Sequence, residues 1–143
     1  MLATEQYSIS KTNNENNYST LACDGRVLDL EVQGVILEAQ FKLEDGSTLI
    51  WLTEDSPYDE GLHVYLIDEN NNILDALETN SIFTPGILKI TKTGKNWVEF
   101  EFFSNDSIYR LEVKKMASFR MSLPRGWKYK SLLKLHQLTI SKT

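Results

Sequence analysis

Residues 35–43 alternate between side chains suited to a buried face and side chains suited to a wetter one. The first set is Val35, Leu37, Ala39, Phe41 and Leu43, and the second is Ile36, Glu38, Gln40 and Lys42. Successive side chains of a β-strand point to opposite faces, so a period of two predicts a strand with one face in the core. Turn-forming residues follow at 44–47, and an apolar run follows at 48–53. The sequence therefore predicts a β-hairpin over residues 35–54.

Similar turn-forming clusters recur along the rest of the chain. Turn-forming clusters separate β-branched and aromatic runs, which occupy residues 62–68, 88–92, 97–103 and 108–115. The last two runs predict a second hairpin over residues 97–115. Short strands at regular spacing predict an all-β fold, an antiparallel β-sandwich or a partly closed β-barrel of about 8–10 strands.

Three segments leave alternatives open. Residues 73–79 fit a short helix as well as a short strand, because Ile73, Leu74 and Leu77 share one face of a helical turn. Residues 128–135 tolerate a helix, whereas residues 136–141 alternate and favour a closing strand. Residues 1–17 are polar and form either a flexible segment or an edge hairpin that begins near Tyr7.

Length and composition favour one cytoplasmic domain over residues 1–143. A chain of 143 residues suffices for one core, and it carries no internal repeat. No apolar stretch reaches the roughly 18–20 residues that a membrane-spanning helix requires. The first eleven residues lack the basic and apolar regions of a signal peptide. Cys23 has no cysteine with which to pair and follows two apolar residues, so we expect it to be a small buried side chain.

The common cofactor and metal motifs are missing, so no cofactor or metal is expected. The seven glycines form no phosphate-binding or nucleophile-elbow pattern. Cys23, His63 and His136 are too few for a structural zinc site, which requires about four such ligands. A calcium loop starting at Asp68 fails at its sixth position, where Ile73 replaces the required glycine.

The densest polar group lies between residues 54 and 63. Asp59, Glu60 and His63 are the candidate catalytic residues there, because general acid–base catalysis requires a carboxylate within reach of a histidine. The alternative is a solvated turn with an exposed histidine, and the sequence favours that interpretation. An enzyme without a recognisable motif that uses Asp59, Glu60 and His63 is therefore kept as a lower-ranked hypothesis.

Charge is strongly segregated along the chain. Residues 1–88 contain 16 acidic and 3 basic residues, net −13, whereas residues 89–143 contain 4 acidic and 12 basic residues, net +8. Three interpretations compete. Acidic and basic strands could neutralise one another as neighbours, the basic part could face an acidic partner, or it could bind nucleic acid.

The basic part of the chain supplies the candidate binding residues. Basic and aromatic residues interleave there, as in grooves on which bases stack, and the set is Arg120, Arg125, Trp127, Lys128, Tyr129 and Lys130. The sequence pI of about 5.0 disfavours nucleic acid, and Trp127 and Tyr129 could equally pack in the core. An acidic protein is the favoured partner.

These observations lead to a ranked set of functional hypotheses. The first is a non-enzymatic protein-interaction module, an adaptor or a protein-specific inhibitor, which uses a sheet face or edge and the basic C-terminal segment. The second is a β-barrel that binds a small molecule, since a closed β-domain of this length can enclose an apolar ligand. The enzyme that would use the turn around His63 is the third.

Overall fold

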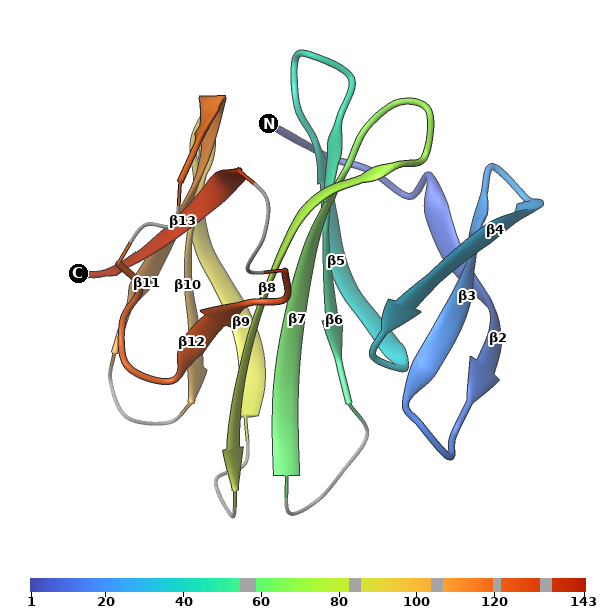
Figure 1. Ribbon diagram of the computed structural model, residues 1–143, viewed down its shortest axis with the longest axis horizontal. Helices are drawn as coiled ribbons and strands as arrows, with labels where there is room; N and C mark the ends of the chain where they lie inside the picture. Colours follow the sequence, from blue (N-terminus) through green and yellow to red (C-terminus); the bar gives the residue numbers. More distant parts are fainter. Residues whose placement is uncertain (55–58, 83–85, 104–106, 120–121, 132–134) are drawn as a thin grey trace.

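A computed structural model describes residues 1–54, 59–82, 86–103, 107–119, 122–131 and 135–143. This part of the chain forms thirteen β-strands and no helix, arranged in three antiparallel sheets (Figure 1). The sheets pack together and do not close into a barrel, which confirms the predicted all-β fold and favours the sandwich. The described residues contain no helix with the length and apolarity that crossing a membrane would require.

The six-stranded sheet lies in the middle of the molecule. Its strands, in spatial order, are β1 (Leu2–Ala3), β5 (Ile36–Lys42), β6 (Thr48–Thr53), β7 (Asp59–Ile67), β8 (Ile73–Ile82) and β12 (Trp127–Tyr129). The four-stranded sheet contains β13 (His136–Lys142), β11 (Tyr109–Ser118), β10 (Trp97–Phe103) and β9 (Gly86–Thr93). The three-stranded sheet contains β2 (Tyr7–Asn13), β3 (Tyr18–Cys23) and β4 (Arg26–Gln33).

Each face of the six-stranded sheet packs against one of the other two sheets, and a separate hydrophobic core lies between each pair of sheets. Along β7, Leu62, Val64 and Leu66 face the core shared with the four-stranded sheet. Tyr65 and Ile67 face the core shared with the three-stranded sheet. Figure 1 shows the four-stranded sheet on the left of the central strands and the three-stranded sheet on the right. Burial on both faces explains why every residue of β6 is buried and why its four central residues are all apolar.

Aromatic rings dominate the core next to the four-stranded sheet. The ring of Phe100 lies 4.9 Å from that of Trp51 and 5.8 Å from that of Trp127, both in edge-to-face contact. Tyr109 stacks on the same phenylalanine at 5.7 Å. Such pairs contribute beyond the area they bury. Residues from three regions of the sequence thus join the two sheets.

The two predicted hairpins are confirmed as β5–β6 and β10–β11. The side-chain assignment within the first hairpin is partly wrong, because the register shifts between Leu37 and Ala39. Leu37 consequently packs in the core next to the three-stranded sheet, while Ala39 and Phe41 pack in the opposite core. A β-bulge of this kind moves side chains to the other face, and an alternating pattern cannot reveal it.

The structure assigns strands within all three ambiguous segments. Of residues 128–135, Lys128 and Tyr129 belong to β12, and residues 132–134 lie outside the described residues. The short helix considered near residues 73–79 is wrong, because those residues belong to β8 and pair with β7 along its length. Residues 7–13 and 18–23 form the hairpin β2–β3, with Asn17 at φ 59° in the turn between them. The closing strand is confirmed as β13. Cys23 is half-buried at the end of β3 rather than fully enclosed.

Candidate functional site

Three neighbouring strands bring together acidic, basic and histidine side chains that lie far apart in the sequence. Glu78 on β8 is directly opposite His63 on β7, and Lys128 on β12 is opposite Glu78 on its other side. Residues that are opposite in an antiparallel pair share one face of the sheet. We use the name polar cluster for Glu54, His63, Glu78, Lys128 and Lys130.

Glu78 is the centre of the polar cluster. Its Oε1 lies 3.1 Å from Nζ of Lys128, and its Oε2 lies 2.5 Å from Nζ of Lys130. His63 Nδ1 lies 3.5 Å from the same Oε2. Contact with His63 is the largest cause of a pKa for Glu78 that lies well below its usual range, and the two lysines lower it further. The carboxylate is therefore ionised at neutral pH.

Glu54 approaches His63 from the opposite side. Its Oε1 lies 3.6 Å from His63 Nε2, so the imidazole is placed between two carboxylates. Both distances exceed those of normal hydrogen bonds, and neither ring nitrogen has a hydrogen-bond partner, so these are electrostatic contacts. Contact with His63 is also the largest cause of the lowered pKa of Glu54. The histidine ring is 4% exposed, which places it at the base of the cluster.

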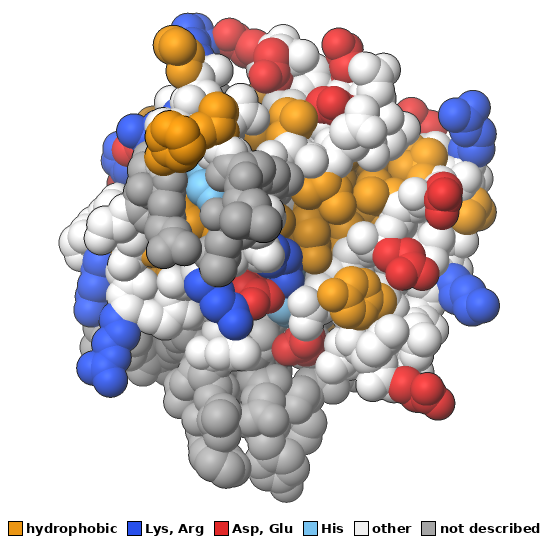
Figure 2. Space-filling view, viewed as in Figure 1, with side chains coloured by type: hydrophobic (Ala, Val, Ile, Leu, Met, Phe, Trp, Pro, Cys, Tyr) orange, Lys and Arg blue, Asp and Glu red, His pale blue; other side chains and the backbone are white. Residues whose placement is uncertain are grey.

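Lys130 is held in a partly buried position on the edge of the polar cluster. Besides Glu78, its Nζ donates to Oε1 of Gln33 at 2.8 Å, and it lies 5.6 Å from the ring of Tyr65. Burial lowers the pKa of Lys130, and the neighbouring Glu78 opposes that effect. Figure 2 shows acidic, basic and histidine side chains meeting near the centre of one face, beside a hollow where hydrophobic side chains gather.

The polar cluster has the groups for proton transfer but little access for a substrate. An imidazole beside two carboxylates and a partly buried lysine can exchange protons. The side chains of Glu54 and Glu78 are only 15% and 18% exposed, and both already contact His63, while Glu78 also contacts Lys128 and Lys130. Among the described residues, no group of three or more His, Cys, Asp or Glu side chains could hold a metal ion.

His63 lies within β7 and is buried, which corrects the expectation of an exposed histidine in a solvated turn. The side chains of Asp59 and Glu60 lie outside the described residues, so their roles stay predictions. Among the described side chains, the carboxylates that contact His63 belong to Glu54 and Glu78. Sequence reasoning missed Glu78 because only the pairing of β7 with β8 brings it close.

The candidate binding residues divide between the surface and the core. Lys128 and Lys130 join the polar cluster, whereas the rings of Trp127 and Tyr129 are buried and pack in the core. Alternation along β12 separates the two pairs, and core packing was one of the two interpretations that the sequence left open. Arg125 is exposed in the turn before β12, and Arg120 lies outside the described residues.

A buried acid–histidine pair joins β8 to β13. Asp75 and His136 are both fully buried, and His136 Nδ1 lies 2.9 Å from Asp75 Oδ1. Asp75 Oδ2 also accepts hydrogen bonds from the backbone N–H groups of Gln137 and Leu138, each at 2.9 Å. The ring of Tyr129 stacks on His136 at 3.7 Å. These contacts fix the edge of the four-stranded sheet to the central sheet.

Residues 114–119, which we call the projecting segment, leave the body of the four-stranded sheet. In the pairing of β11 with β13, Val113 is opposite Leu138 and Ser118 is opposite His136. Residues 114–117 of β11 therefore form a bulge opposite the single residue Gln137. Every residue of the projecting segment is exposed, including Met116 at 82% and Phe119 at 83%. Sequence reasoning missed these residues because an alternating run does not reveal where pairing ends.

Opposite charges meet at several points between the acidic and basic parts of the chain. Lys128 and Lys130 pair with Glu78, and Nζ of Lys95 lies 3.4 Å from Oε2 of Glu44.

No family model matches this chain, and no similar protein was found among the curated proteins or the solved structures.

Proposed function

We propose that the protein is a non-enzymatic interaction module, an adaptor or a protein-specific inhibitor, that binds an acidic protein through the projecting segment. One observation carries this proposal: Met116 and Phe119, both more than 80% exposed, stand beside the exposed Lys114 and Lys115. Methionine and aromatic side chains are enriched where proteins associate. Two neighbouring lysines attract a partner of negative charge and orient its approach.

A cleft at the base of the projecting segment supports the same proposal. Its volume is about 470 Å³, and its apolar lining includes Leu43, Leu66 and Val113. Its charged lining consists of three lysines, Lys95, Lys114 and Lys115, and two acidic residues, Glu44 and Asp45, of which Glu44 is paired with Lys95. An apolar side chain of the partner can enter this cleft while acidic residues around it contact Lys114 and Lys115. A buried anchor surrounded by polar contacts is the usual arrangement at the energetic centre of an interface.

A second candidate is an enzyme that uses His63 for acid–base chemistry. It is favoured by the contacts of His63 with Glu54 and Glu78. It ranks lower because the ring is only 4% exposed, and a substrate would have to displace the surrounding side chains to reach it. Loss of turnover of a candidate substrate in His63→Ala, with the fold retained, would support this function.

Photo-crosslinking tests the proposed interaction directly. A photoreactive phenylalanine analogue replaces Met116, and crosslinked proteins are identified from extracts at low salt. The partner is then purified and its affinity is measured for the unmodified protein, for K114E/K115E and for M116S/F119S. We expect each double variant to weaken binding by about tenfold or more, and added salt to weaken it further.

The matched control is I87S/K92E on β9, which removes one exposed apolar side chain and reverses one exposed lysine elsewhere on the four-stranded sheet. The control is expected to retain the affinity of the unmodified protein. A crosslinked partner that binds K114E/K115E and M116S/F119S as tightly as the unmodified protein contradicts the proposal. So does equal loss in the control.

A further inference from the structure

One edge of the six-stranded sheet is only partly covered. β1 pairs with β5 through Leu2↔Lys42 and Ala3↔Phe41, and the backbone N–H of Thr4 then donates to the carbonyl of Gln40 at 3.1 Å. Beyond that point the chain leaves the edge and continues into β2. Within the described part of the protein, residues 36–39 have no strand partner on this side. An unpaired strand edge is a template for a further strand.

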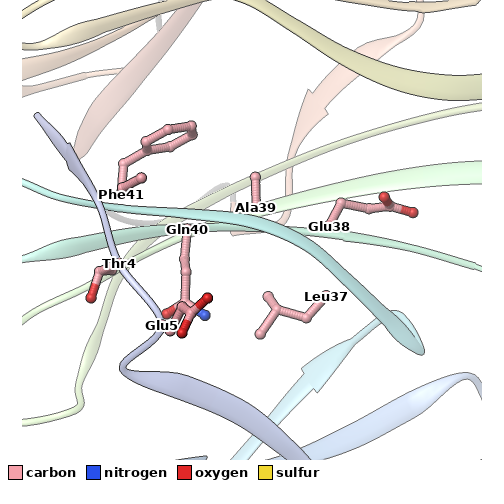
Figure 3. Close-up of a pocket in the computed structure, with 8 residues that line it drawn as sticks. Thr4, Glu5, Leu37, Glu38, Ala39, Gln40 and Phe41 are labelled. Carbon is pink, nitrogen blue, oxygen red and sulfur yellow. The ribbon is translucent and has the colours of Figure 1, made fainter.

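A cavity of about 690 Å³ lies beside this edge. Its lining consists of Ala3, Thr4, Glu5, Leu37, Glu38, Ala39, Gln40 and Phe41. Figure 3 shows Thr4, Glu5 and Gln40 on the side where the first residues of the chain cross β5, with Leu37 further along the strand. The cavity therefore continues along the edge from the point where β1 ends.

Hydrogen bonds hold one wall of this cavity in place. The side chain of Gln40 accepts a hydrogen bond from the backbone N–H of Tyr7 at 2.9 Å and donates one to its carbonyl at 2.8 Å. Tyr7 is itself buried in the core next to the three-stranded sheet. The departing chain is thereby fixed away from residues 36–39. A preformed site loses less conformational entropy on binding than a mobile one.

The charges around the cavity select the kind of segment that can bind. Glu5 and Glu38 are exposed, and the described residues that line the cavity include no lysine or arginine. Glu38 Oε1 accepts a hydrogen bond from Oγ1 of Thr53 on the neighbouring β6 at 2.7 Å, and Figure 3 shows Glu38 and Glu5 on opposite sides of β5, so each side of the strand has one carboxylate. We infer that this edge binds an extended, lysine- or arginine-containing segment of a partner protein, which adds to the central sheet as a strand beside β5.

Strand addition divides affinity and selectivity between different groups. Backbone hydrogen bonds from residues 36–39 supply affinity for any extended segment, and alternate side chains supply selectivity. Leu37 and Ala39 offer partly buried apolar surface, whereas Glu5 and Glu38 favour cationic side chains. A second copy of this chain fits poorly, because pairing two β5 edges would bring the Glu38 carboxylates together.

A synthetic peptide of about ten residues that alternates lysine and valine serves as the probe. The comparison peptide alternates glutamate and valine and has the same length and capped ends. Fluorescence anisotropy measures affinity, and hydrogen exchange measures protection of backbone amides. We expect the lysine peptide to bind about tenfold or more tightly than the glutamate peptide. We also expect it to protect amides within residues 36–39, which attraction between charges alone would not do.

The variant E5K/E38K should weaken binding of the lysine peptide by about tenfold or more. Its matched control is E15K/E31K, which reverses two exposed glutamates outside the cavity and produces the same net charge. The milder E5Q/E38Q should also weaken binding and provides the test if E5K/E38K fails to fold. Four outcomes would each overturn the inference. Two concern affinity: equal binding of both peptides, or an equal loss of affinity in E15K/E31K. Two concern the site: protection of amides elsewhere than residues 36–39, or dimerisation through β5 without peptide.

Discussion

His136 Nδ1 lies 2.9 Å from Asp75 Oδ1, and neither side chain is exposed to solvent. Asp75 also accepts hydrogen bonds from the backbone of Ala76 and from two residues of β13, so its carboxylate is fully surrounded by donors. A buried acceptor with this many partners is costly to replace, because a buried N–H group left without an acceptor costs free energy. The pair therefore joins the central and four-stranded sheets through polar contacts inside an apolar core.

Replacing Asp75 with asparagine should destabilise the protein. The amide removes the negative charge and places an N–H₂ group against donors that require an acceptor, so we expect a loss of about 3 kcal/mol in the free energy of unfolding. Urea denaturation monitored by tryptophan fluorescence measures it. The control Asp29→Asn changes an exposed aspartate on β4 and should stay within about 0.5 kcal/mol of the unmodified protein. Equal stability of the two variants would contradict this role for Asp75.

Glu78 should make stability depend on pH. Its pKa in the folded protein lies well below the ordinary value of 4.5, so its contribution is complete above pH 4.5 and is lost as the pH falls toward the folded pKa. Glu78→Gln should therefore reduce the free energy of unfolding by about 2 kcal/mol at pH 7, and by progressively less below pH 4.5. Denaturation of both proteins across this pH range measures the difference.

The control for Glu78 is Glu101→Gln. Glu101 Oε2 lies 3.9 Å from Nζ of Lys89, whose side chain is 72% exposed, and such surface pairs contribute little. We expect less than about 0.5 kcal/mol at pH 7. A difference between Glu78→Gln and the unmodified protein that stays constant from pH 7 into the acid range would show that the lowered pKa of Glu78 does not stabilise the fold.

Local signals were sufficient to predict the class of the fold and its central hairpins. Residues 35–54 contain both an alternating pattern of apolar and polar side chains and a turn sequence, so neighbouring residues alone predict β5 and β6. The bulge at Glu38 does not follow, because it depends on packing against both cores. β8 has no distinct local period, and its identity as a strand depends on pairing with β7.

The polar sites depend on pairing between distant strands and were therefore only partly predictable. The sequence offers His63, Lys128 and Lys130 as separate candidates, and the sheet brings them together at Glu78. Lys130 and Glu78 are 52 residues apart in the chain, and Asp75 and His136 are 61 apart. The segregation of charge along the chain left pairing of opposite charges as one of three interpretations, and strand order determines which charges meet.

Gly61 should be required for the position of Glu54. A Cβ atom at residue 61 would clash with Oε2 of Glu54 and would lie 3.2 Å from Nε2 of His63. Gly61→Ala should destabilise the protein by about 1 kcal/mol, because the added methyl group must displace the carboxylate from the histidine, and that carboxylate is the end of a flexible side chain. The free energy of unfolding is measured in a double-mutant cycle with Glu54→Ala. The cost of Gly61→Ala should shrink when residue 54 is alanine, and an unchanged cost would place the strain elsewhere.

The substitution of phenylalanine by alanine should be costly at Phe100 and nearly neutral at Phe119. Phe100 is fully buried among Trp51, Tyr109 and Trp127, and Phe100→Ala should reduce the free energy of unfolding by about 4 kcal/mol. Phe119 is 83% exposed, so Phe119→Ala should change that free energy by less than about 0.5 kcal/mol. Thermal and urea denaturation of the two variants measure both values. An aromatic ring that contributes nothing to the stability of its own fold is available to a partner. A large loss of the free energy of unfolding in Phe119→Ala would instead show that this ring stabilises the fold. That result would remove the main support for the projecting segment as an interface.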